Sequence, residues 1–294
     1  MGEKKNSVIK TIFKSKEIGI IAILIVLSIA IQIKNPIFLT YNNIVDVCRN
    51  TSYTLIIAIG MTFVLIAKGL DLSVGSLMAL GGLVASLAMT NGVPIILAVI
   101  LGIIVGAAFG VVNAFCIVKL NIPAMIASLG TMYMARGLVL IITKGSPVFP
   151  LPEAFSAFGK GFLIGLPYVV IIAIILSIIA HLILTKTTYG RKVYAIGGNP
   201  ETAKFAGINV AMVTASCYLI SGSLAALSGI LTAARMGSGQ PSIGDGTEMT
   251  VITAVIIGGT SLNGGAGTIL SVSSLILFFI LVTDFGCTLN LHFP

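Results

Sequence analysis

Long apolar runs without a charged residue cover most of the chain. Segments 50–67, 72–118, 161–185, 205–234 and 249–283 hold no Asp, Glu, Lys or Arg. A helix needs about 20 predominantly apolar residues to cross a bilayer. The pattern therefore predicts an all-α, polytopic helical membrane protein with about 8–10 membrane elements. We place these elements at 18–33, 50–67, 74–90, 95–118, 122–142, 161–184, 208–233, 249–258 and 268–283.

The composition agrees with a membrane protein and excludes several other classes. Of the 294 residues, 57% are hydrophobic and 9% are charged, whereas an ordinary soluble domain has about 25% charged residues. Too few charges remain to solvate the surface of a soluble enzyme, a nucleic-acid-binding domain or a disordered chain. We predict a single transmembrane domain over residues 18–284.

The basic residues gather in two short segments, which predicts the orientation of the chain. Cytoplasmic loops of membrane proteins carry the excess of Lys and Arg. Six predicted spans separate the two clusters, and an even number places both on one side, which we assign to the cytoplasm. A cleaved signal peptide is the alternative for residues 1–17, but no small-x-small cleavage site follows the first span. The clusters consist of Lys4, Lys5, Lys10, Lys14 and Lys16, and of Lys186, Arg191, Lys192 and Lys204.

The motifs of common enzymes are missing from the sequence. There is no GxxxxGK[ST] phosphate-binding loop; the fragment Gly159-Lys160-Gly161 lacks both the upstream glycine and the hydroxyl residue. The sequence also contains no HExxH motif, no carboxylate cluster and no Ser/His/Asp arrangement. We therefore expect a protein that is not an enzyme, with no metal site and no cofactor of its own.

A polar segment at 68–76 interrupts two apolar runs. It contains Asp71 and Ser73 between glycines. Non-helical backbone at membrane depth is tolerated only where protein or water covers it, and transporters often use such breaks to bind polar substrates. The alternative is a short cytoplasmic turn in which Asp71 or Ser73 caps the next helix. We keep both interpretations and count Asp71 and Ser73 as candidates for a substrate path.

Further polar and glycine residues lie inside the apolar runs. Gly102, Gly106 and Gly110 recur every four residues, which predicts a flat face for close helix packing, and Asn113 lies near that face. Arg136 within an apolar run is a functional candidate, unless its side chain extends to the outer interface near Lys144. A glycine-rich stretch at 258–267, with Thr260 and Ser261, predicts a broken or re-entrant element. Asn113, Arg136, Thr260 and Ser261 complete our candidate substrate path.

The basic segment 190–209 contains the start and stop signals of a short helix. Asn199 suits the N-cap, Pro200 the first helical position, Glu201 the helix dipole and Gly207 the residue after the C-terminus. We predict a helix of about seven residues, and a capped helix on the cytoplasmic face is suited to dock a soluble partner. A plain surface turn is the alternative.

Six motifs follow one another along the chain: GLDLSVGS (69–76), ASLGTMYMARG (127–137), KGSP (144–147), YGRKVYAIGGNPETAKFAGIN (189–209), Gln240-Pro241 and GGTSLNGGAGTI (258–269). Together and in this order they resemble one family, the ribose/xylose/galactose-type permeases of bacterial ABC importers. The related branched-chain amino acid permeases share the architecture, but the residues in these motifs are more similar to those of the sugar permeases. The resemblance covers about Phe38 to Leu270.

The resemblance implies a permease subunit of the bacterial inner membrane that imports a monosaccharide. It implies a second permease copy or paralogue as dimer partner, cytoplasmic ATPase subunits that use the ATP, and an extracytoplasmic sugar-binding protein. It also implies that segment 185–207, here called the coupling segment, contacts the ATPase. The coupling residues that we single out are Gly197, Gly198, Asn199, Pro200, Glu201, Ala203 and Gly207.

The chain departs from the pattern of this family after Leu270. The tail 285–294 has no terminal Lys or Arg, and we expect a truncated or frame-shifted end. The tail keeps a truncated, non-functional permease as one alternative function, and a secondary transporter driven by an ion gradient is a separate alternative. The ion-coupled transporter would need ionisable residues deep in several spans, where only Asp71 and Arg136 qualify.

Overall fold

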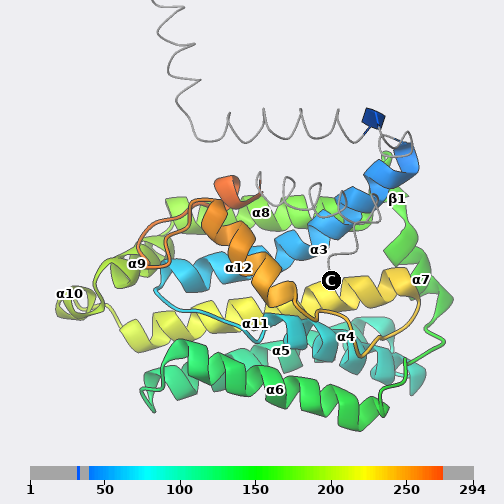
Figure 1. Cartoon of the computed structure of the whole chain (residues 1–294), viewed down its shortest axis with the longest axis horizontal. Coiled ribbons are helices and arrows are strands. Elements are labelled where there is room, and N and C mark those ends of the chain that lie inside the picture. Colours follow the sequence, from blue (N-terminus) through cyan, green and yellow to red (C-terminus); the bar gives the residue numbers. More distant parts are fainter. Residues whose placement is uncertain (1–31, 34–39, 274–294) are drawn as a thin grey trace, which may run out of the picture.

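The structure is a computed structural model, and it describes residues 32–33 and 40–273. In this part the chain is mainly helical (Figure 1), with one two-stranded antiparallel hairpin. The elements are α3 (Tyr41–Ile66), α4 (Val74–Thr90), α5 (Ile95–Val118), α6 (Ala124–Thr143), α7 (Glu153–Lys160), β1 (Phe162–Leu163), β2 (Leu166–Pro167), α8 (Tyr168–Lys186), α9 (Thr188–Gly198), α10 (Pro200–Phe205), α11 (Val210–Met236) and α12 (Thr247–Ile257).

Five of these helices are long and apolar enough to cross a membrane, and they differ in how deeply they are buried. The most apolar stretch of α3 is 83% buried, whereas those of α5 and α8 are each 22% buried. The side chains of α5 and α8 that face outward are large and apolar, among them Ile100, Ile104 and Ile178. Because α3 is the most buried of these helices, it is the central one. The outward apolar surface suits lipid chains, so α5, α6 and α8 form the lipid-facing shell.

Glycines bring α5 close to α11 and α4. A Cβ atom added to Gly106 would overlap the carbonyl of Gly222, and one added to Gly110 would overlap the carbonyl of Tyr218. At Gly102 it would lie 2.6 Å from the carbonyl oxygen of Gly81 on α4. The three glycines therefore form one face at which backbones touch, because any larger side chain would push the helices apart.

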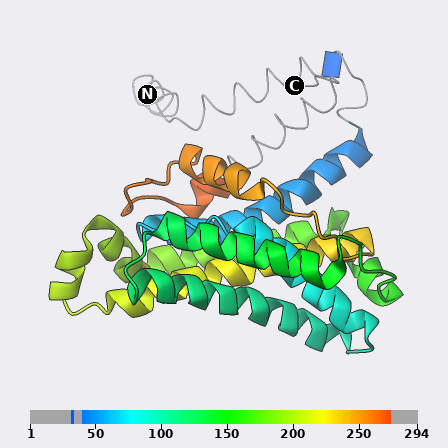
Figure 2. The ribbon, with the colours of Figure 1, turned by 60° about the horizontal axis from the view of Figure 1, so that its bottom comes forward.

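Two helices begin inside the bundle instead of at its ends. In Figure 1 the connection 67–73 leaves the left end of α3 and runs back to the middle of the bundle, where α4 starts. The connecting segment 237–246, which forms turns over 241–246, returns in the same way from the right end of α11 to the start of α12. Figure 2 shows α12 on the opposite side of the bundle from α5. The two ends of the molecule carry the short elements, α9 and α10 on the left and α7 with β1 on the right.

The predicted helix boundaries agree with the structure where turn signals flank the helix, and fail where they do not. The predicted spans 74–90 and 95–118 coincide with α4 and α5. α3 begins at Tyr41 instead of residue 50, because Asp46 and Arg49 lie inside the helix. α8 begins at Tyr168 instead of residue 161, because 162–167 forms the hairpin. The predicted span 18–33, except its last two residues, lies outside the described residues. Residues 274–283 and the tail 285–294 lie outside them as well.

Candidate functional site

A buried polar network surrounds Asp71 in the connection 67–73, here called the Asp71 segment. The Asp71 side chain is completely buried. Its Oδ1 atom accepts hydrogen bonds from the backbone N–H of Ser73 at 3.0 Å and from the Ser73 hydroxyl, and its Oδ2 atom accepts one from Ser221 at 2.8 Å. The network therefore joins the Asp71 segment to α11, 150 residues further along the chain.

The network continues into α5 and α6. The amide nitrogen of Asn113 donates to the Ser73 hydroxyl at 3.0 Å and lies 3.4 Å from Asp71, while its amide oxygen accepts from Thr131 at 2.6 Å. All five side chains are at most 3% exposed. Such a network gives each buried polar group a partner and so fixes the irregular backbone inside the bundle.

Asp71 and Ser73 are therefore buried inside the bundle and do not lie in an exposed turn. The expected capping bond from Ser73 to α4 is also not formed. Ser73 precedes α4, but its side chain makes no capping bond to the helix and donates to Asp71 instead. Tyr218 on α11 holds the neighbouring residue from both sides, because its hydroxyl donates to the carbonyl of Leu70 and accepts from the N–H of Leu70.

Arg136 lies apart from this network and does not extend toward Lys144. Its guanidinium group donates to the carbonyls of Pro241 and Ile243 and forms an ion pair with Asp245 at 2.7 Å. These acceptors belong to the connecting segment 237–246. Arg136 thus anchors the segment that leads back into the bundle to α12, which provides a structural reason for an arginine within an apolar run.

The starts of α4 and α12 meet inside the bundle. A Cβ atom on Gly75 would overlap the carbonyl of Gly244 and the carboxylate of Glu248, and one on Gly244 would overlap the carbonyl of Gly75. Glu248 lies in the first turn of α12. Two helix N-termini, each with a positive dipole end, thus approach a single carboxylate at this point, which stabilises the junction.

Thr260 and Ser261 lie in a second irregular stretch, 258–267, here called the glycine loop. Thr260 is buried, and its hydroxyl oxygen has no hydrogen-bond partner. The Ser261 backbone N–H donates to the carbonyl of Ala266 at 2.9 Å, and the Ser261 hydroxyl accepts from the N–H of Asn263. Among the bonds that the structure describes, neither residue reaches the Asp71 network.

The coupling segment contains two helices, of which the sequence predicted one. α10 spans six residues, and the Asn199 side chain caps it by accepting from the N–H groups of Glu201 and Thr202. Pro200 occupies its first position, and Gly207 follows with a φ of 78°. Ala203 is buried, whereas Phe205 is 92% exposed. The preceding helix α9 was not predicted; Thr187 caps it by accepting from the N–H of Gly190.

The coupling segment touches both α3 and the glycine loop at one glycine. A Cβ atom on Gly197 would overlap the last carbonyl of α3, at Ile66, and the backbone of Gly265, while one on Gly198 would meet nothing within 4 Å. The Gly265 N–H donates to the same Ile66 carbonyl at 2.9 Å. The Tyr194 hydroxyl adds a bond of 2.6 Å to the carbonyl of Gly267, and burial raises the pKa of Tyr194, which keeps the hydroxyl protonated as a donor.

The structure thus brings together half of the predicted path and disperses the rest. Asp71, Ser73 and Asn113 form one network, whereas Arg136 and the glycine loop belong to other contacts. Sequence reasoning missed Thr131, Ser221, Tyr218, Asp245 and Phe205. Thr131 was within reach, because it lies five residues before Arg136 in the same motif. Ser221 and Tyr218 give no local signal, because their partners are about 150 residues away.

No group of three or more His, Cys, Asp or Glu side chains that could hold a metal ion occurs in the described part of the chain.

Comparison with known proteins identifies relatives over nearly the whole chain. Residues 43–288 match the family described as branched-chain amino acid transport system / permease component. A ribose import permease protein of Bacillus subtilis is 40% identical over 248 residues, which are 84% of this chain and 77% of that protein. One of Haemophilus influenzae is 36% identical over 274 residues, covering 91% and 84%.

A galactose/methyl galactoside import permease protein of Salmonella typhimurium is 33% identical over 292 residues, which are 93% of this chain and 87% of that protein. No solved structure gives a significant match. A family match of this length, with relatives that align over 84–93% of this chain, agrees with the five apolar helices of a multi-pass membrane protein. The chain belongs to the family of permease components of branched-chain amino acid transport systems.

Proposed function

We propose that the chain is the membrane-spanning permease subunit of an ATP-driven importer that carries a monosaccharide, ribose or a similar simple sugar. The observation that carries the proposal is the identity of 33–40% to permeases that are named for ribose and galactose import. The broken helices support it, because helices that begin inside a bundle leave backbone groups available for polar substrates. The two interior starts, of α4 and α12, meet at Gly75 and Gly244.

The coupling segment is proposed to dock an ATPase subunit on the cytoplasmic side. Its exposed end presents Phe205 beside the charged side chains of Glu201 and Lys204, which suits an apolar anchor within a polar rim. The contacts of Gly197 with α3 and the glycine loop provide the route by which a movement of α10 would reach the membrane helices. Alternating access then follows from a rigid-body shift of these elements.

The polar positions that we assign to the path are Asp71, Ser73 and Asn113, now with Thr131 and Ser221. In the described conformation they are closed to solvent, so their proposed role is to hold the start of α4 in place beside the path. The remaining partners, a second permease copy and an extracytoplasmic sugar-binding protein, stay proposals, and so does the cytoplasmic N-terminus.

Reconstitution in proteoliposomes tests the proposal. The permease is combined with the ATPase and binding protein that co-purify with it, and uptake of labelled D-ribose, D-galactose and L-leucine is measured with and without ATP inside the vesicles. We expect ATP-dependent uptake of one of the sugars. Uptake of L-leucine alone would instead assign the chain to the amino acid branch.

The two rival functions predict different results in the same assay. An ion-coupled secondary transporter would accumulate the sugar without ATP, and an ionophore that collapses the ion gradient would stop it. A truncated, non-functional permease would not bind the ATPase. Substituting Phe205→Ala, with the exposed Thr202→Ala on the same helix as control, tests the docking claim: we expect loss of ATPase binding only for Phe205→Ala.

A further inference from the structure

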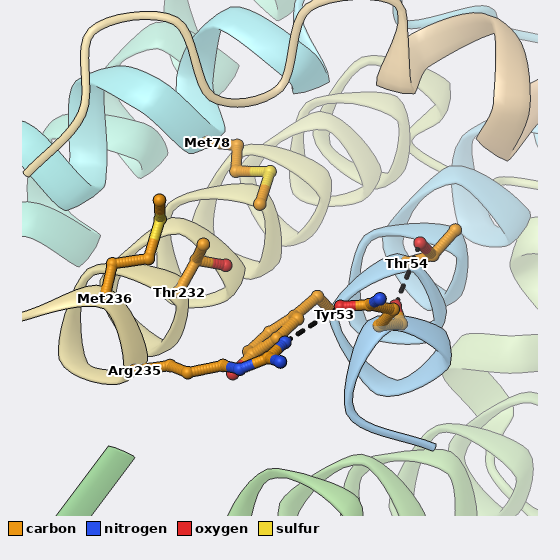
Figure 3. Close-up of a pocket in the computed structure, with 7 residues that line it drawn as sticks. Tyr53, Thr54, Met78, Thr232, Arg235 and Met236 are labelled. Atoms are coloured by element: carbon orange, nitrogen blue, oxygen red, sulfur yellow. Dashed lines mark hydrogen bonds between the residues drawn. The ribbon is translucent and has the colours of Figure 1, made fainter. Parts of the chain in front are cut away.

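A pocket of about 540 Å³ opens between α3 and α11 at the end of the molecule that carries α7. Its volume lies within the range of about 300–1,000 Å³ that is typical of small-molecule sites. Figure 3 shows that side chains from α3, α4 and α11 converge on it. Asn50, Tyr53, Thr54, Met78, Thr232, Arg235 and Met236 line this pocket, here called the Tyr53 pocket.

The Tyr53 pocket combines polar groups with apolar walls. Asn50, Thr54, Thr232 and Arg235 supply donors and acceptors, while Met78 and Met236 supply soft apolar surface. A monosaccharide presents the same mixture, with hydroxyl groups around its edge and C–H groups on its faces. By contrast, the groove lined by Ile59, Phe63, Leu176 and Leu219 on α3, α8 and α11 is almost entirely apolar and suits lipid.

The position of the charged side chains indicates that water reaches this pocket. Asp46, half of whose side chain is exposed, forms an ion pair of 2.8 Å with Arg235, and Arg235 also donates to Asn50 at 2.9 Å. Partly exposed charges of this kind are costly against lipid chains. The ion pair joins α3 to α11 beside the pocket and holds the guanidinium group in place.

Tyr53 provides the observation that points to a ligand. The residue is 6% exposed, and its hydroxyl is buried without a hydrogen bond of normal geometry, although the guanidinium group of Arg235 lies close to it. A buried hydroxyl without a partner is unfavourable. Native proteins keep few such groups, and they tend to occur where a function requires them. A ligand hydroxyl that enters beside Arg235 would provide the missing partner.

We propose that the Tyr53 pocket is a binding site for the transported monosaccharide, in which Arg235 and Asn50 bond ligand hydroxyls and Tyr53 gains its missing partner. This inference rests on the proposed function, because it assumes that the substrate is a sugar. It adds a location to that function: the predicted orientation places the pocket on the outer half, where a sugar delivered from outside arrives first. The buried Asp71 network lies deeper in the bundle.

The chain contains no tryptophan, so one introduced tryptophan gives a unique fluorescent reporter. Met236→Trp places it at the rim of the Tyr53 pocket, where Met236 is half exposed. Leu219→Trp, on the apolar groove and 41% exposed, is the matched control. We expect D-ribose or D-galactose to change the emission of Met236→Trp saturably and to leave that of Leu219→Trp unchanged, in the full-length permease in lipid nanodiscs.

Tyr53→Phe separates a binding role from a structural one. Removing one hydroxyl that bonds the ligand is expected to raise the sugar Kd about tenfold. Without sugar, the same substitution removes a hydroxyl that has no partner, so the thermal stability is expected to stay equal or to rise. A structural tyrosine would behave in the opposite way, with lower stability and unchanged Kd.

Two results would overturn the inference. One is an emission of Met236→Trp that no sugar changes while the wild-type importer takes up D-ribose; the proposed function then stands, and the pocket is not the site. The other is a sugar Kd that Tyr53→Phe leaves unchanged. Should Met236→Trp fail to fold, the rise in the wild-type melting temperature caused by the sugar gives the same Kd comparison. Uptake of L-leucine alone would overturn both proposals.

Discussion

The Asp71 segment and the glycine loop are both irregular stretches within a helical membrane protein, but different means hold them in place. The Asp71 segment is fixed by side chains: one carboxylate, three hydroxyls and one amide bond one another. The glycine loop is fixed by backbone contacts with Ile66 and Gly197, and it contains a hydroxyl without a partner at Thr260. Polar side chains thus fix the Asp71 segment, whereas glycines allow the backbone of the glycine loop to pack directly against its neighbours.

This difference assigns the two segments different tasks. A network in which every buried group has a partner resists displacement, because any movement breaks several bonds at once. Backbone surfaces in contact across glycines resist overlap but carry few directional bonds. We therefore expect the Asp71 segment to act as a fixed anchor for α4 and the glycine loop to act as the element that moves with the coupling segment.

The largest expected effect is that of Asp71→Ala. It removes the common acceptor of Ser73 and Ser221 and leaves buried donors without partners, which should lower the free energy of unfolding by roughly 2–5 kcal/mol. Thermal unfolding of the purified permease measures the loss. Asp245→Ala removes a carboxylate that is 68% exposed and is expected to cost about 0–1 kcal/mol. Equal losses in the two variants would contradict the anchor role.

Gly197→Ala tests the other half of the comparison. A methyl group at Gly197 would overlap the backbone of Ile66 and Gly265, and such overpacking typically costs about 1–3 kcal/mol. We expect ATP-driven uptake to fall sharply while the permease still binds the ATPase. Gly198→Ala is the matched control, because nothing lies within 4 Å of the added atom. If the two neighbouring alanine variants transport equally well, the glycine contact does not transmit the movement.

Tyr194→Phe examines a hydrogen bond between the coupling segment and the glycine loop. The substitution removes the hydroxyl that donates to the Gly267 carbonyl at 2.6 Å and should lower the free energy of unfolding by about 1 kcal/mol. Hydrogen exchange of the glycine loop is expected to become faster, while exchange in the Asp71 segment stays the same. Faster exchange in both segments would show that they move together.

Local signals were sufficient for part of this structure. The turn-forming residues Asn91, Gly92 and Pro94 lie between the predicted spans 74–90 and 95–118, where α4 ends and α5 begins, and the cap at Asn199 with Pro200 marks the start of α10. In each case the relevant atoms lie within four residues, so the sequence displays both the group and its partner.

Contacts between residues far apart in the sequence could not be predicted, because local sequence signals show only partners a few residues away. Asp71 stood out because a carboxylate between apolar runs is unusual, but Ser221 resembles any other serine in a helix until the fold brings it to 2.8 Å from that carboxylate. Arg136 was assigned to the path because its partners, the carbonyls of Pro241 and Ile243, carry no signal in the sequence. The charges of Asp46 and Arg49 were taken as a boundary of α3, although they lie within its first turns.

Thr260→Val is expected to have the smallest effect, and it sharpens the comparison most directly. Valine has nearly the same shape as threonine, so the substitution in the glycine loop removes only a hydroxyl that has no partner, and the free energy of unfolding should change by less than about 0.5 kcal/mol. The same substitution at Thr131 removes the donor to Asn113 and should cost about 1–3 kcal/mol. Two threonines that are equally buried would then differ because only one of them belongs to a network. Equal losses on thermal unfolding would mean that the hydroxyl of Thr260 is bonded in the membrane, and that the glycine loop is anchored in the same way as the Asp71 segment.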